Sequence, residues 1–158
     1  LWQEPAHAVI DNYDHFSNPA RACQLSIPTT DTKVRPKASG YRNEGTTNQF
    51  VICGLDNLDF VSQSVLVLGI GLASMDGVAH DVSCTAVTGL TGYAALQYST
   101  KTINVPASAF VQTTWDAASF GGAGPRIDAS INPSITCTLP PNVAITYVYE
   151  FSDIDIGA

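Results

Sequence analysis

Residues 131–139 read INPSITCTL, and their strict alternation decides the fold class. The odd-numbered positions are apolar and the even-numbered positions are polar. Successive side chains of a β-strand point to opposite faces, so the pattern predicts a half-buried strand with Cys137 facing the core. Residues 80–86, HDVSCTA, repeat the alternation and place Cys84 on the apolar face. Both cysteines therefore face a core, and they can meet across neighbouring strands or between sheets.

The cysteine pattern predicts a disulfide framework. The chain has four cysteines, none of them in a C-x-x-C pair, which disfavours zinc-finger and redox-motif interpretations. An even count in an acidic chain with few lysines favours two disulfides and an oxidising compartment. Four cysteines allow three connectivities. Because Cys84 and Cys137 both face inward, we expect them to pair, which leaves Cys23 and Cys53 for each other.

The period of two recurs along most of the chain. Candidate strands occupy residues 22–27, 33–41, 48–54, 61–73, 79–87, 93–99, 102–112, 127–138 and 142–151. Turn-forming residues separate many of them, at 43–45, 56–57, 76–77, 89–92 and 140–142. Many short strands at this spacing predict an all-β protein built as a two-sheet antiparallel β-sandwich, either jelly-roll or immunoglobulin-like. Residues 22–158 are expected to form that single domain, and 117–125 a mobile surface loop.

The N-terminal stretch, residues 1–21, has a different period. Its apolar residues follow spacings of 4, 3, 4 and 3, at Trp2, Ala6, Val9, Tyr13 and Phe16. This spacing predicts one face of an amphipathic helix that begins near residue 5 and ends at residues 17–19. Two interpretations stay open: a short helix over one end of the sandwich, or an arm that docks on a neighbouring subunit.

Two strands have informative faces. Residues 64–73, SVLVLGIGLA, are apolar on both faces, and one face carries Gly69 and Gly71. Glycines in a strand let another group approach the backbone closely, so we expect this face to be covered by the N-terminal segment, a long loop or another subunit. In the last strand, Tyr147, Tyr149 and Phe151 share one face with Val143 and Ile145. We expect that face in the core.

Composition excludes some classes of function. The 158 residues carry a net charge of −7 with only seven Lys and Arg, which argues against nucleic-acid binding. One basic cluster exists, formed by Lys33, Arg35, Lys37 and Arg42. It is expected to be a solvated strand face, with an anion or polysaccharide site as the alternative. No apolar run approaches the roughly 20 residues of a membrane span. The first residue is Leu1, so we expect a mature product whose leader has been removed.

No motif predicts catalysis, a cofactor or a metal. His7, His15 and His80 lack a second histidine at ligand spacing. Acidic pairs near the two ends, Asp11 with Asp14 and Asp153 with Asp155, could hold calcium, but they do not match a dedicated calcium loop. Trp115, beside the Ala- and Gly-rich segment, is the expected exposed aromatic residue for a ligand platform.

Several short runs suggest a family. They are FVIC at 50–53, VSC at 82–84, ITCTLPP at 135–141 and GYRNEGTT at 40–47. Over residues 22–150 the chain resembles a loose family of small secreted bacterial proteins with four cysteines. The resemblance implies export, four half-cystines and a β-sandwich, and it transfers no active residue.

The leading functional hypothesis is a non-catalytic extracellular protein that assembles with copies of itself into a filament, pilus-like fibre or surface layer. The doubly apolar strand and the apolar N-terminal stripe motivate it. The expected assembly surface comprises Trp2, Val9, Tyr13, Phe16, Val65, Val67, Gly69 and Gly71. The alternative is a secreted carbohydrate-binding or adhesive module that binds glycans at Trp115. A secreted hydrolase ranks third, because no nucleophile–base pair is evident.

Overall fold

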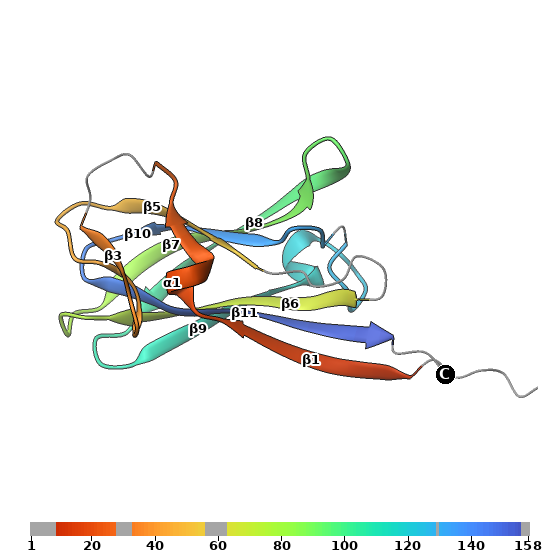
Figure 1. Cartoon of the computed structure of the whole chain (residues 1–158), viewed down its shortest axis with the longest axis horizontal. Helices are drawn as coiled ribbons and strands as arrows, with labels where there is room; N and C mark the ends of the chain where they lie inside the picture. The colour runs from red at the N-terminus through yellow and green to blue at the C-terminus, as the bar shows by residue number, and fades with distance from the viewer. Residues whose placement is uncertain (1–8, 28–32, 56–62, 129, 156–158) are drawn as a thin grey trace, which may run out of the picture.

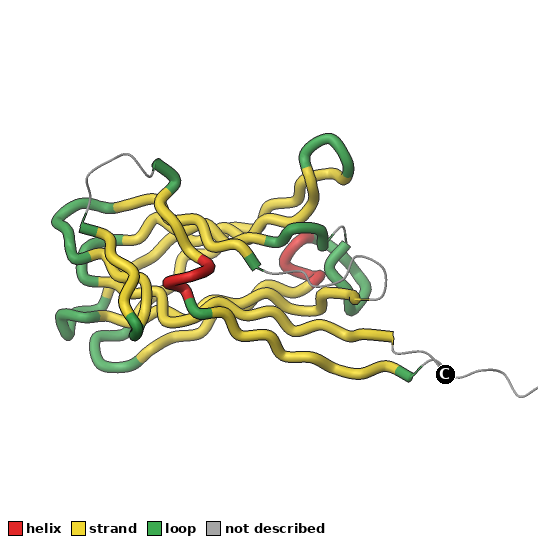
Figure 2. Tube along the Cα trace, in the orientation of Figure 1, coloured by secondary structure: helices red, strands yellow, loops and turns green. Residues whose placement is uncertain are grey.

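The computed structural model describes residues 9–27, 33–55, 63–128 and 130–155. Two antiparallel sheets pack face to face, as Figure 1 and Figure 2 show, and they confirm the predicted two-sheet sandwich. Sheet A, the lower layer in Figure 1, contains β1 (Ile10–Ser17), β3 (Val34–Lys37), β4 (Gly40–Asn43), β6 (Gln63–Ser74), β9 (Phe110–Asp116) and β11 (Val143–Asp155). Sheet B contains β2 (Cys23–Leu25), β5 (Gln49–Gly54), β7 (His80–Leu90), β8 (Ala94–Val105) and β10 (Ser134–Leu139).

The long strand β11 organises sheet A. The strand order is β3-β4-β11-β6-β9, and β1 pairs with the second half of β11, beyond the point where β4 pairs with its first half. Sheet B has the order β2-β5-β10-β7-β8. The core between the sheets is apolar and includes the fully buried Leu68, Ile70 and Leu72 of β6, which face Val82 and Ile135 in the same cluster.

Both disulfides lie within sheet B and join neighbouring strands. Cys84 on β7 is directly opposite Cys137 on β10, and Cys23 on β2 is directly opposite Cys53 on β5. The pairings Cys84–Cys137 and Cys23–Cys53 are confirmed. Of the two arrangements left open for the first pair, the cross-strand one is the one that forms. All four cysteines are buried.

The predicted N-terminal helix is wrong over the residues that the structure describes. Residues 10–17 form strand β1, which pairs with β11 along its whole length. Asp, Asn, Tyr, His and Phe are weak helix formers, and the edge of β11 offers a full set of backbone partners. Among the described residues, the one α-helix is the short α1 (Pro19–Ala22). Asn18 caps its N-terminus, because the Asn18 side chain accepts a 2.9 Å hydrogen bond from Ala20 N. Residues 17–19, which were predicted to end a helix, therefore lie where one begins.

Other boundaries also differ from the predicted ones. The expected strand 127–138 begins only at Ser134, as β10. The expected strand 33–41 is a hairpin of β3 and β4. The expected strands 93–99 and 102–112 are instead the long β8 and the shorter β9. Part of the expected loop 117–125 is the 3-10 helix η1 (Ala117–Phe120), because Asp116 and Ser119 cap it reciprocally. Trp2, His7 and the turn at 56–57 lie outside the described residues.

Candidate functional site

A β-bulge in β11 turns a row of aromatic side chains to the outer face of sheet A. Ile145 is opposite Leu72 of β6, but Tyr147 is opposite Gly71, so Thr146 is an extra residue. An extra residue reverses which side chains face inward. Before it, Val143 and Ile145 are fully buried; after it, the inward positions are Val148, Glu150 and Ser152, and Tyr149 is 9% exposed because other rings cover it on the outer face. The prediction that Tyr147, Tyr149 and Phe151 face the core is therefore wrong, and these aromatics lie on the outer face of sheet A.

The two glycines of β6 seat the tyrosine rings. A Cβ atom at Gly69 would lie 2.0 Å from Cε1 of Tyr149, and one at Gly71 would lie 2.5 Å from Cε1 of Tyr147. Any other residue at these positions would overlap a ring. The second apolar face of the strand at 64–73 is thus covered from within the chain, by side chains of the neighbouring strand. A second bulge in β6, where Leu66 is the extra residue, turns Val65 into the core.

Two exposed phenylalanines complete a continuous aromatic surface. Phe16 of β1 is 60% exposed and Phe110 of β9 is 61% exposed. The rings of Phe16 and Tyr149 are stacked, with their centroids 5.2 Å apart. The centroid of the Tyr147 ring lies 5.5 Å from that of Phe16 and 6.4 Å from that of Phe110, and both contacts are edge to face. We call Phe16, Phe110, Tyr147 and Tyr149 the aromatic platform. Exposed apolar patches of this kind mark interaction sites.

Polar groups accompany the rings. The Tyr147 hydroxyl donates a 2.8 Å hydrogen bond to Oε1 of Gln112, the exposed β9 residue in the same row of the sheet. Burial raises the pKa of Tyr147, and the neighbouring Tyr149 raises it further. Burial also raises the pKa of Tyr149; the hydrogen bond with Gln112 opposes that rise and the charge of Asp14 adds to it. At neutral pH the surface therefore offers neutral hydroxyls and an amide beside apolar ring faces.

Few of the residues expected to form a site are available for binding. Trp115 is fully buried, with Lys101 Nζ 5.6 Å from its ring centroid, so the expected exposed platform at Trp115 is wrong. The remaining members of the expected assembly surface divide into two groups. Val9, Tyr13 and Phe16 are at least 40% exposed, whereas Val65, Gly69 and Gly71 are buried, Val67 is half-buried, and Trp2 lies outside the described residues.

Sequence reasoning missed Phe110, Gln112 and the two tyrosines as surface residues. The glycine pair of β6 was the available signal, because it predicts close approach to the backbone. Nothing in the spacing of residues 143–151 marks the extra residue at Thr146.

Neither the acidic clusters nor the basic cluster forms a recognisable binding site among the described residues. The pairing of β1 with β11 brings the acidic ends together, with Asn12 opposite Asp153 and Ile10 opposite Asp155. Among the described residues, however, no three His, Cys, Asp or Glu side chains converge as metal ligands. In the basic cluster, Lys37 lies 3.7 Å from Glu44, in keeping with a solvated strand face.

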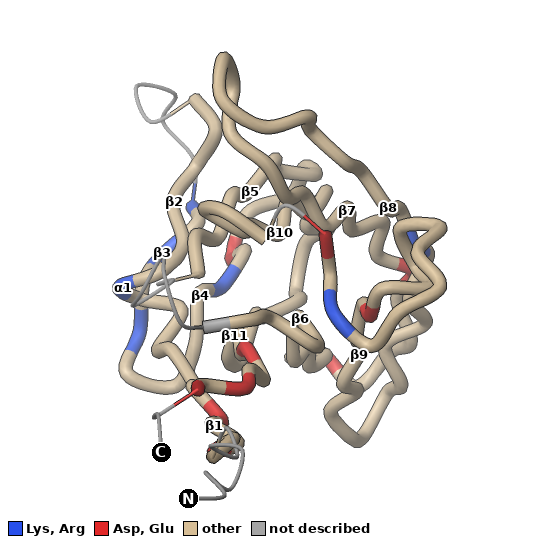
Figure 3. Tube along the Cα trace, turned by 90° about the vertical axis from the view of Figure 1, so that its right-hand side faces the viewer, with Lys and Arg blue, Asp and Glu red and all other residues tan. Residues whose placement is uncertain are grey.

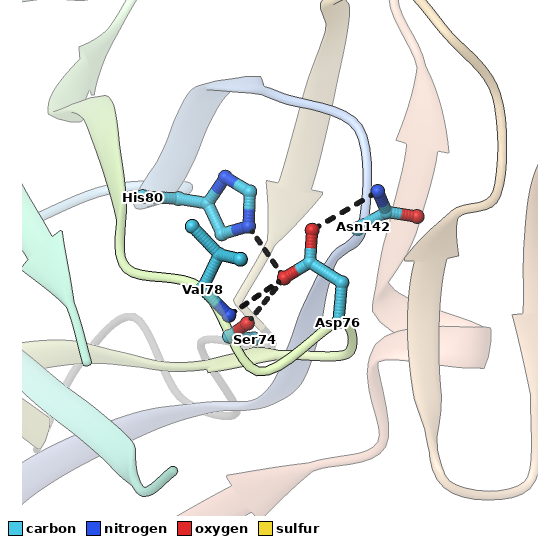
Figure 4. A network of polar contacts seen from close by, with 5 residues as sticks. All are labelled: Ser74, Asp76, Val78, His80 and Asn142. Atoms are coloured by element: carbon cyan, nitrogen blue, oxygen red, sulfur yellow. Dashed lines mark hydrogen bonds and ion pairs between the residues drawn. The ribbon is translucent and has the colours of Figure 1, made fainter. Parts of the chain in front are cut away.

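A polar network ties two turns together at the other end of the sandwich. As Figure 4 shows, Asp76 Oδ1 accepts hydrogen bonds from Ser74 Oγ and Val78 N and lies 2.9 Å from His80 Nε2. Asp76 Oδ2 accepts from Asn142 Nδ2, which belongs to the turn before β11. The hydrogen bond with His80 is the largest cause that holds the pKa of the Asp76 carboxyl well below its ordinary value, and the bonds from Val78 and Ser74 add to it. With its carboxylate so engaged, we assign the network a structural role.

A small pocket lies at the edge of sheet B. It measures about 150 Å³ and is lined by Leu25, Ser26, Ile27, Gln49 and Phe50. This is well below the volume of ordinary small-molecule sites, about 300–1,000 Å³. In the described ranges, no helix has the length and hydropathy needed to cross a bilayer.

Comparison with known proteins yields no family. No family model matches the sequence, and no curated protein matches it, so the resemblance to a secreted bacterial family is not confirmed. Among solved structures, the chain is similar to a family 11 carbohydrate-binding module from Clostridium thermocellum in complex with a β-1,3-1,4-mixed-linked tetrasaccharide, at 14% identity and a TM-score of 0.41 over 92% of this chain and 87% of that one. It is also similar to a CBM4 structure, at 13% identity and a TM-score of 0.34 over 92% and 84%. Similarity at these TM-scores carries no functional argument.

Proposed function

We propose that this protein is a non-catalytic carbohydrate-binding protein that holds a glycan against the aromatic platform of sheet A. The observation that carries the proposal is the pair of phenylalanines, each about 60% exposed, on a continuous surface with two tyrosines and Gln112. A pyranose ring has an apolar face of C–H groups and a rim of hydroxyls. The platform offers the matching combination: ring faces for the apolar side, and phenol and amide groups for the hydroxyls.

The expected affinity is modest. Fully burying one phenylalanine side chain is worth about 1.5–3 kcal/mol, and Phe16 and Phe110 expose only part of theirs. Losing either ring should therefore weaken glycan binding by about tenfold, since 1.4 kcal/mol corresponds to a factor of ten. The whole platform is expected to give dissociation constants on the order of micromolar to millimolar.

We also propose that the protein works outside the cell, at or near the cell surface. Two buried disulfides support this placement, because disulfides persist in oxidising compartments and are rare in the cytosol. A neutral platform of this kind would suit attachment to polysaccharides there.

Self-assembly is the weaker candidate, because the features that motivated it have explanations within one chain. The second face of β6 is covered by Tyr147 and Tyr149, and the N-terminal strand pairs with its own β11. Outer strands also carry features that discourage edge-to-edge pairing. Pro36 and Lys37 lie on β3, and Lys101 of β8 faces inward and donates to Thr114 O at 2.7 Å.

The test is a glycan panel followed by titration calorimetry on the full chain. The proposal predicts binding to at least one neutral oligosaccharide, weakened about tenfold in Phe16→Ala and in Phe110→Ala. Tyr98→Ala is the matched control, because Tyr98 is 62% exposed on the opposite sheet. Absence of any glycan hit, or equal losses in the control, would overturn the proposal. Concentration-dependent oligomers abolished by Phe16→Ala would instead support self-assembly.

A further inference from the structure

Two aspartates border the aromatic platform on one side. Strand register defines the outer face of sheet A as rows: Thr114, Gly69, Tyr149 and Phe16 form one row, and Asp116, Val67, Phe151 and Asp14 form the next. Successive rows are about 6.7 Å apart along the strands. Both carboxylates are exposed. We call Asp14 and Asp116 the acidic border.

The charge of Asp14 reaches the platform. Asp14 raises the pKa of the Tyr149 hydroxyl through its negative charge. Hydrogen bonds from Ser119 hold the pKa of the Asp116 carboxyl below its ordinary value, so Asp116 is ionised at neutral pH. Lys101 also lowers the pKa of Asp116, which means that its positive charge partly offsets that carboxylate. Asp14 is therefore the stronger member of the pair toward a ligand.

Arginines lie on both sides of the platform, and they are engaged elsewhere. On the acidic side, Arg126 Nη2 donates to Asp153 Oδ2 at 3.0 Å, and Asp153 is opposite Asn12, one row beyond Asp14. Two more arginines lie on the opposite side. Arg42 and Arg35 share the row of Ala144, beyond Tyr147. Arg42 Nη2 donates to Ser39 Oγ at 2.6 Å, and Arg35 Nη1 donates to Val34 O at 3.1 Å. No arginine contributes to the pKa shifts of the two tyrosines, whereas Asp14 does. In Figure 3, acidic segments lie near β1 and β11, several basic segments lie near α1, β3 and β4, and another basic segment lies beside β9.

Taking the proposed function as given, we infer that the platform selects glycans that carry ammonium groups, such as deacetylated amino-sugar chains, over neutral chains and most strongly over uronate chains. Two physical effects favour an ammonium group here. Asp14 attracts it by charge, and the exposed faces of Phe16 and Phe110 attract a cation through the ring quadrupole. A uronate carboxylate meets repulsion from the acidic border and gains nothing from the rings.

The size of the preference follows from Coulomb's law. One pair of unit charges about 7 Å apart in water changes a binding constant by about threefold at low ionic strength. Salt at physiological strength screens exposed charges at about this separation. The preference should therefore be a few-fold at low salt and should shrink as salt is added, while stacking on the rings persists.

The experiment compares three tetrasaccharides of matched length with the full chain: glucosamine, N-acetylglucosamine and galacturonic acid oligomers. Titrations are run at mildly acidic pH, where the amines of the glucosamine oligomer are protonated. We expect affinity to fall from the cationic to the neutral to the anionic oligomer, and the ratios to narrow at high salt. In Asp14→Asn the cationic oligomer should lose about threefold while the neutral oligomer is unaffected. Asp81→Asn, an exposed aspartate on sheet B, should change nothing.

The outcomes separate this inference from the proposed function. Binding of the neutral oligomer without discrimination by charge, or an unchanged ratio in Asp14→Asn, would overturn the inference and leave glycan binding intact. Absence of binding to all three oligomers and to the neutral panel would overturn both.

Discussion

Replacing Gly69 by alanine tests the seating of the platform most sharply. The new Cβ would lie 2.0 Å from Cε1 and 2.3 Å from Cδ1 of Tyr149. To reach an ordinary contact of 3.4 Å, the ring must retreat by about 1.4 Å. Phe16 stacks on Tyr149 at 5.2 Å, so the tyrosine cannot move outward without displacing that ring. One methyl group in β6 should therefore disturb the exposed part of the platform on β1.

The expected cost has two components. Overpacking of this kind destabilises by about 1–3 kcal/mol, which lowers Tm by about 2–12 °C in a chain of this length. Displacement of Phe16 should also weaken glycan binding by about tenfold even at temperatures where the variant is fully folded. Differential scanning calorimetry measures the first effect and titration calorimetry the second. Near-ultraviolet circular dichroism reports whether the tyrosine environment has changed.

A matched control separates crowding from the loss of a glycine. Gly54 of β5 also lies in a strand, and a Cβ built there meets nothing within 4 Å. Gly54→Ala should therefore be neutral or stabilising by about 0.4–1 kcal/mol, because alanine reduces the entropy of the unfolded chain. If Gly69→Ala matches Gly54→Ala in stability and binds glycan normally, Tyr149 does not rest on Gly69 and the reasoning fails.

Three further predictions concern the scaffold. The double variant Cys84→Ala/Cys137→Ala should lower the free energy of unfolding by about 2–4 kcal/mol in denaturant titrations; no loss would show that this bridge does not constrain the chain. Trp115→Ala should cost about 3–5 kcal/mol because its side chain is fully buried, and a cost under about 1 kcal/mol would place it at the surface. The folded-state pKa of Asp76 is depressed, so its contribution is present above its ordinary pKa of 3.8 and is lost as pH falls below that value. Asp76→Asn should accordingly flatten the dependence of stability on pH under acidic conditions, and an unchanged slope would contradict the network in Figure 4.

Much of the fold could be predicted because alternation is a local property. The pattern at residues 131–139 places Cys137 inward, and the pattern at 80–86 does the same for Cys84; each conclusion needs only one strand. The disulfide pairing followed from those two parities. Turns rich in Gly, Pro, Asn and Asp at 76–77 and 140–142 were equally local signals.

The aromatic platform was missed because it depends on register between strands. Alternation through residues 143–151 holds only if no residue is inserted, and the bulge at Thr146 reverses the faces of Tyr147 and Tyr149 without any mark in composition. The prediction of an N-terminal helix was wrong for a related reason. The apolar spacing there suits a helix, but pairing with β11 supplies backbone partners that no pattern within residues 9–17 reveals. The glycines at 69 and 71 did signal a close contact, yet not which side chains would make it.

The most direct test of the central claim is aromatic-resolved NMR during titration with the tightest-binding glycan from the panel. The account predicts shift changes at Phe16, Phe110 and Tyr147, smaller ones at the nearly covered Tyr149, and none at Tyr93 and Tyr98, which are exposed elsewhere. Shifts confined to Tyr93 and Tyr98, with the four platform rings unmoved, would contradict it.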